Sequence, residues 1–145
     1  MSKEMETLYS ELFEAAGAAR RFGEGLAARQ GQTQARWQAM WIIDLEDRLT
    51  VPQIARRLGV ARQSVQRVVD ELAEEGLVAA TLNPDHKTSP LFQLTDQGRT
   101  VLEAINRDAD GAHERILEGF PIADVRALRR LLVALTAATR MHHDV

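Results

Sequence analysis

The sequence contains no cysteine among its 145 residues. Disulfide bonds, thiolate metal sites and thiol-based redox sensing are therefore excluded, and no structural zinc site is expected. No apolar run is long enough to cross a bilayer, and the first residues, MSKEMETLYSEL, lack the apolar core of a signal peptide. We therefore expect a cytoplasmic protein with no membrane partner.

An excess of positive charge is also missing, because the formal net charge is −3. A broad basic surface is thus excluded, and any contact with nucleic acid must come from a local patch. The composition, with 45% hydrophobic and 27% charged residues, is that of a globular chain. The length suits one domain, or one domain with a docking extension.

Recognisable catalytic motifs are absent as well. The sequence has no glycine-rich phosphate loop, no nucleophile elbow and no pair of acidic residues at a useful spacing. We therefore expect a protein that is not an enzyme, with no cofactor and no bound metal.

The spacing of apolar residues predicts a mainly α fold with a small β-hairpin. Thr33 and Thr95 are predicted helix N-caps, and Gly59, Gly76 and Pro121 are predicted breaks. The predicted helices cover 5–29, 34–46, 51–58, 61–75, the segment from Thr95 to near Gly119, and the segment from 122 onward; the predicted strands cover 77–82 and 90–95, with a brief strand at Leu49-Thr50. The helix at 34–46 is apolar on most sides and is expected to be largely buried.

One basic segment stands out in this acidic chain. Residues 51–69 include four arginines and no acid, and Asp70 and Glu71 follow directly. Ala55 permits close helix contact and Gly59 permits a tight turn, which together are typical of a helix-turn-helix. The apolar residues expected to face the joint are Ile54, Leu58, Val60, Val65 and Val68.

The second helix of this pair has two different faces. Val65, Val68, Val69 and Leu72 share one face. Gln63, Gln66 and Arg67 lie opposite, flanked by Arg62 and Ser64. Arginine suits guanine and glutamine suits adenine in the major groove, so these five residues are predicted to contact DNA. The alternative is a structural helical pair with a solvated polar face.

The hairpin that follows suggests a winged helix. Asp85, His86 and Lys87 in its loop are predicted to reach the minor groove or a phosphate, the alternative being an ordinary polar turn. Long helices with apolar stripes flank the unit, and they are predicted to bury a dimer interface that matches a two-fold operator. The alternative is that they close the core of a monomer. The clearest stripe consists of Ile122, Val125, Leu128, Leu131, Leu132 and Leu135.

The segments LTVPQIARRLGVARQSVQRVVDELAEEGLV and NPDHKTSPLFQLTDQGRTVLEAI resemble the MarR family of transcriptional regulators. The resemblance runs from about residue 33 to the end and implies a two-fold dimer, a recognition helix at 61–75 and a wing loop at 83–89. It implies three regions: an N-terminal dimerisation helix at 1–32, a winged helix-turn-helix domain at 33–95 with its wing hairpin at 77–95, and C-terminal dimerisation helices at 96–145.

Many members of this family repress genes and release DNA when a small aromatic or lipophilic ligand binds. The resemblance therefore implies a homodimeric repressor on a pseudo-palindromic operator in double-stranded DNA, with a small-molecule effector. One rival is a regulator without a ligand, and another is a winged-helix interaction or dimerisation module without ligand sensing. The chain departs from the family pattern at Lys87, where an arginine is common, and at Ala61, where a capping serine or threonine is common.

A ligand pocket is predicted beside the two tryptophans. Trp37 and Trp41 lie one turn apart, with Arg36 and Met40 adjacent, and Arg36 or Arg20 is expected to attract a carboxylate or phenolate. The alternative, favoured by the 5% aromatic content, is that both tryptophans pack the core.

Overall fold

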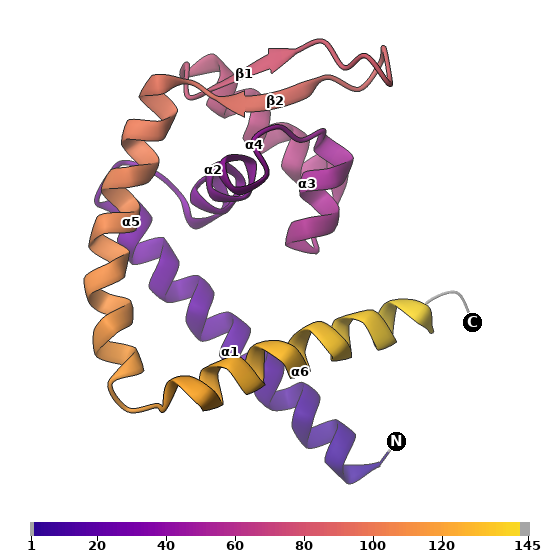
Figure 1. The fold of residues 1–145 in the computed structure, drawn as a ribbon, viewed down its shortest axis with the longest axis vertical. Helices are drawn as coiled ribbons and strands as arrows, with labels where there is room; N and C mark the ends of the chain where they lie inside the picture. The colour runs from indigo at the N-terminus through magenta and orange to yellow at the C-terminus, as the bar shows by residue number, and fades with distance from the viewer. Residues whose placement is uncertain (1, 143–145) are drawn as a thin grey trace. The chain divides into compact units, whose positions relative to one another are not determined.

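The computed structural model describes residues 2–142, which form six α-helices and a two-stranded antiparallel sheet (Figure 1). In chain order the elements are α1 (Lys3–Ala28), α2 (Gln34–Glu46), α3 (Val51–Leu58), α4 (Arg62–Glu74), β1 (Val78–Thr81), β2 (Leu91–Leu94), α5 (Asp96–Leu117) and α6 (Ile122–Met141). The predicted fold class, mainly α with a small β-hairpin, is confirmed.

The chain divides into two compact units that meet within α5, between Asp108 and Ala109. The first unit contains α1 to α4, the hairpin and the first half of α5. The second contains the end of α5 and α6. The predicted division into regions 1–32, 33–95 and 96–145 separates dimerisation helices from a DNA-binding domain, and it stays a prediction.

Side-chain caps define the helix starts. The Thr33 hydroxyl accepts a hydrogen bond from the backbone N–H of Arg36 (3.2 Å), and the Thr95 hydroxyl accepts one from Gly98 (3.0 Å). Thr50 and Gln53 form a reciprocal capping box at the start of α3. A cap of this kind stabilises a helix by about 1 kcal/mol. Because the cap bonds a backbone N–H only three residues away, the starts of α2 and α5 lie where the sequence predicts them.

The core of the first unit lies between α2, α3, α4, the hairpin and α5. Its fully buried large side chains are Met40, Ile43, Ile54, Val69, Leu72, Leu102 and Ile105. The prediction that 34–46 is largely buried holds only for one side of α2. Trp41 is 49% exposed and Leu45 is 61% exposed, because they lie on the side of the helix away from this core.

The hairpin is attached to the helices at two points. Val78 pairs with Leu94 and Thr81 with Leu91 in the sheet, and Leu49 forms an isolated bridge with Phe92, where a brief strand was predicted. At the other end of the hairpin, the backbone N–H of Thr95 donates to the Leu77 carbonyl (3.1 Å). The wing is thereby fixed to both the α2–α3 connection and the start of α5.

In the second unit, α6 has no buried residue. Its predicted apolar stripe is solvent-accessible, with Leu128 58% and Leu131 67% exposed. Within residues 2–142, no helix is both long and apolar enough to span a bilayer.

Candidate DNA-binding surface

The α3–α4 pair is held by a small apolar joint. Ile54, Ala55 and Val65 are buried, and Leu58 and Val68 are half-buried. Gly59 adopts the left-handed conformation (φ 68°) that the turn requires.

Val60 departs from the prediction that it faces this joint. Its side chain is 47% exposed. Its backbone N–H, not its side chain, closes the turn by donating to the Ala55 carbonyl (3.1 Å). The turn is therefore stabilised by main-chain hydrogen bonding at this position.

Helix α4 has one buried face and one exposed face. Val65, Val69 and Leu72 are buried against the core. The residues predicted to contact DNA, namely Arg62, Gln63, Ser64, Gln66 and Arg67, are all exposed. The sequence pattern thus places five polar side chains on a surface that a DNA groove can reach.

Arg62 and Arg67 differ from several other arginines in their charge environment. Within residues 2–142 neither of them forms an ion pair, whereas four arginines elsewhere in the first unit are paired with acidic residues. These pairs are Arg36–Glu75, Arg48–Asp47, Arg57–Glu46 and Arg99–Asp44. The two exposed guanidinium groups of α4 are therefore available to phosphates or base edges.

The start of α4 has no side-chain cap. Ala61 occupies the N-cap position in an extended conformation, as its residue type predicts. The first N–H groups of a helix carry partial positive charge and suit an anion such as a phosphate. The uncapped end lies beside Arg62, which adds a full positive charge.

The wing loop is organised by Asn83. Its side-chain oxygen accepts from the backbone N–H of Asp85 (3.1 Å), and its amide donates to the Ser89 carbonyl (3.0 Å). Asp85, His86 and Lys87 are exposed, where they were predicted to meet DNA. The structural role of Asn83 was not predicted, although Asn-Pro-Asp is a common start for a turn of this kind.

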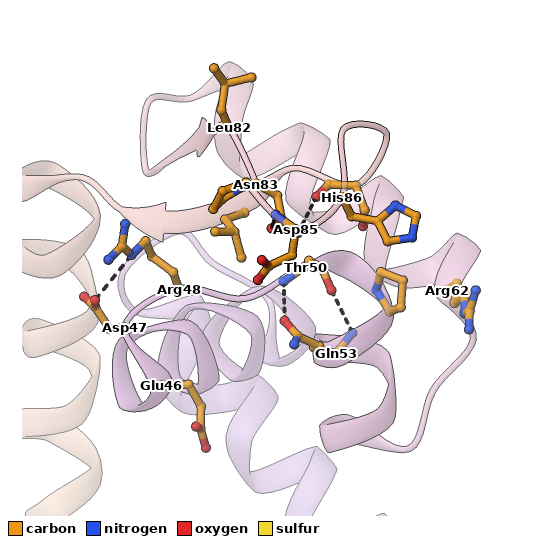
Figure 2. A pocket seen from close by; sticks show the side chains of 14 residues that line it. Glu46, Asp47, Arg48, Thr50, Gln53, Arg62, Leu82, Asn83, Asp85 and His86 are labelled. Carbon is orange, nitrogen blue, oxygen red and sulfur yellow. Dashed lines mark hydrogen bonds and ion pairs between the residues drawn. The ribbon is translucent and has the colours of Figure 1, made fainter.

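A surface hollow of about 850 Å³ lies between the wing and the start of the helix-turn-helix. Figure 2 shows Asp85 above the Thr50–Gln53 capping pair, with Arg62 at one edge. The hollow therefore brings Arg62, Asp85 and His86 around one space, whereas Lys87 does not line it. Its lining includes acids and bases together, among them Asp47 and Arg48, so its charge favours neither an anion nor a cation.

The predicted ligand residues do not line this hollow. Met40 is fully buried and packs the core, and Arg36 is ion-paired with Glu75. Trp37 is half-buried, and its indole N–H donates to the Asn106 side chain (2.9 Å).

Two members of the predicted ligand set remain accessible. Trp41 is 49% exposed on α2, which corrects the alternative that both tryptophans are core, and Arg20 is exposed on α1.

In the part of the chain from residue 2 to 142, no three histidine, aspartate or glutamate side chains are grouped to hold a metal ion.

Comparison with known proteins relates the sequence to a family. A family model described as MarR family matches residues 30–87, which extend from just before α2 into the wing loop. The uncharacterized protein Rv2011c of Mycobacterium tuberculosis strain H37Rv is 49% identical over 141 residues. This match covers 94% of the chain and 98% of the relative.

Solved structures share the fold. A MarR family transcriptional regulator from Streptomyces coelicolor is 26% identical, with a TM-score of 0.76 and coverage of 97% of this chain and 99% of that one. A mutant MarR from E. coli complexed with operator DNA is 20% identical (TM-score 0.77, coverage 91% and 95%). NadR in complex with 4-hydroxyphenylacetate is also 20% identical (TM-score 0.81, coverage 88% and 91%). The latter two similarities show the fold alone.

Proposed function

Because the chain belongs to the MarR family of transcriptional regulators, we propose that it acts as a homodimeric repressor on a pseudo-palindromic operator in double-stranded DNA. It is a DNA-binding transcription regulator and not an enzyme. The observation that carries the proposal is the exposed face of α4, where Arg62 and Arg67 have no acidic partner among the described residues. A recognition helix with this face enters the major groove, and the wing approaches the adjacent backbone.

The proposed dimer forms through the terminal helices. The apolar stripe of α6, including Leu128 and Leu131, is exposed in the single chain and has the composition of an interface core. We propose that regions 1–32 and 96–145 supply this contact, apart from residues such as Leu102 and Ile105 that are buried in the core of the first unit. A two-fold dimer presents two copies of α4, which suits half-sites about one helical turn apart.

The proposed effector is a small aromatic or lipophilic molecule that releases the protein from its operator. NadR, which shares the fold, was solved with 4-hydroxyphenylacetate, a small aromatic acid. The half-exposed Trp41 offers a ring surface to such a molecule, with Trp37 on the same helix. Arg20 is the proposed cation for its acid group, because Arg36 is already paired with Glu75. A repressor acts on the chromosome, so the proposed function agrees with the expected cytoplasmic location.

A gel-shift experiment with genomic fragments tests the proposal. Wild type is expected to retard specific fragments in the presence of competitor DNA. Arg67→Ala should weaken specific binding by about 1–3 kcal/mol if the side chain contacts a base. Arg107→Ala on α5 removes the same charge from an exposed position outside α4 and the wing, and it serves as the control once sedimentation velocity shows the same mass as wild type.

Two results would count against the proposal. If Arg67→Ala bound the specific fragment as tightly as wild type, Arg67 would be removed from the proposed DNA contacts. If no fragment were retarded even at low salt, the interaction or dimerisation module without DNA binding would be the better account.

A further inference from the structure

An acidic residue lies on the DNA-facing side of α4 and binds one of the predicted base-reading side chains. The Gln66 amide nitrogen donates to a carboxylate oxygen of Asp70 at 2.9 Å. Both residues are exposed, and they lie one helical turn apart. An acid on this side needs an explanation, because negative charge near DNA opposes binding to phosphates.

The hydrogen bond fixes which way the Gln66 amide points. A glutamine side chain can rotate by 180° and exchange its oxygen and nitrogen positions. A carboxylate has only acceptors, so only the amide nitrogen can face Asp70. The orientation therefore follows from the chemistry of the partner.

The atoms that remain define what Gln66 can recognise. One N–H is held by Asp70, which leaves the second N–H as a donor and the carbonyl oxygen as an acceptor. This pair complements the N7 acceptor and N6 donor of adenine in the major groove. Guanine presents two acceptors there, which would face the Gln66 oxygen and the nearby negative charge of Asp70.

We infer that Asp70 is a positioning residue that orients Gln66 to read adenine at one position in each operator half-site. The inference rests on the proposed function and adds the base that this helix selects. Holding the side chain before DNA arrives also reduces the rotamer freedom that is lost on binding.

Selection of bound duplexes from a randomised pool tests the inference with the full chain. Four proteins are compared: wild type, Gln66→Ala, Asp70→Asn and Glu71→Gln. Gln66→Ala identifies the position that Gln66 reads, as the one where the adenine preference is lost. Asp70→Asn keeps the side-chain shape but lets the amide of Gln66 rotate, since asparagine can both donate and accept. Glu71→Gln removes the same charge from the next exposed residue and is the matched control.

The expected result is a wild-type preference for adenine over guanine at that position, on the order of tenfold. Asp70→Asn should lose most of this preference, and Glu71→Gln should keep it. Fluorescence anisotropy titrations with two duplexes that differ only at this base measure the ratio of the adenine and guanine affinities directly.

Two outcomes would overturn the inference while leaving the proposed function in place. In the first, Gln66→Ala selects the same bases as wild type, so Gln66 reads nothing. In the second, Asp70→Asn and Glu71→Gln change overall affinity alike and leave the base preference intact, so Asp70 acts only through charge. If the wild-type protein itself selected no sequence, the proposed function would be overturned as well. This outcome is distinguished from the first two because it is seen without any substitution.

Discussion

The indole nitrogen of Trp37 donates a 2.9 Å hydrogen bond to the side-chain oxygen of Asn106, joining α2 to α5. The preceding residue, Arg36, forms an ion pair with Glu75 at the C-cap of α4. Two consecutive residues of α2 therefore contact the C-terminal end of α4 and the first half of α5.

Replacing Trp37 with phenylalanine tests the first of these contacts. Trp37→Phe keeps an aromatic ring but leaves the part-buried Asn106 oxygen without its donor, so the free energy of unfolding should fall by about 1–3 kcal/mol. Trp41→Phe, at a half-exposed position on the same helix, should change it by less than about 0.5 kcal/mol. Urea unfolding measures both, and equal losses would show that the hydrogen bond to Asn106 has no special role.

Gly98 is required where α5 begins beneath the hairpin. A Cβ at this position would lie 1.9 Å from the Leu77 carbonyl oxygen, which is backbone and already accepts from Thr95. Gly98→Ala should therefore destabilise the fold by about 3 kcal/mol or more. Gly111→Ala in the same helix meets no atom within 4 Å and should stabilise it by about 0.5–1 kcal/mol. Thermal unfolding of the two variants should shift in opposite directions, and a Gly98→Ala protein as stable as wild type would contradict this packing.

The helix-turn-helix and the helix starts could be predicted because their signals are local. The caps made by Thr33 and Thr95 and the turn at Gly59 involve residues within four positions, so a short stretch of sequence contains these contacts. The second hydrogen bond of Thr95, from its hydroxyl to the Gly76 carbonyl (2.6 Å), spans 19 positions. The spacing of the valines on α4 likewise predicted which face is buried.

The partners of the predicted ligand residues could not be foreseen. Arg36 meets a residue 39 positions away and Trp37 one 69 positions away, and only packing brings them together. The exposure of Trp41 depends on which sides of α2 the other elements cover. The Gln66–Asp70 bond was missed despite its i,i+4 spacing, which is a usable local signal.

The protein should bind operator DNA more strongly if Lys87 in the wing loop is replaced with arginine. Lysine contributes a point charge, whereas arginine offers a planar set of donors that suits a narrow minor groove. Lys87→Arg should therefore raise operator affinity by about 1 kcal/mol or less, mainly on operators with A·T-rich flanks. Lys87→Gln should lower it on all flanks. Affinity measured on A·T-rich and G·C-rich flanks separates the two effects, and an arginine variant no tighter than wild type on either flank would exclude a minor-groove contact.

The apolar stripe of α6 should determine the oligomeric state. Leu128→Glu places a charge at the centre of the stripe and should convert the proposed dimer to a monomer at micromolar concentration, since an unpaired buried charge costs several kcal/mol. Arg130→Glu lies on the opposite side of the helix and should leave the dimer intact. Sedimentation velocity reports both masses. A wild-type protein that is monomeric throughout, or a Leu128→Glu protein that remains dimeric, would remove α6 from the proposed interface.

The salt dependence of operator binding shows whether α4 and the wing contact the DNA backbone. If the outer face of α4 and the wing meet the DNA backbone, the logarithm of the affinity should fall linearly with the logarithm of the salt concentration, by about 0.9 log unit per log unit for each phosphate neutralised. A dimer that neutralises several phosphates should give a steep line in fluorescence anisotropy titrations between low and physiological salt. An affinity that does not change with salt would contradict the account.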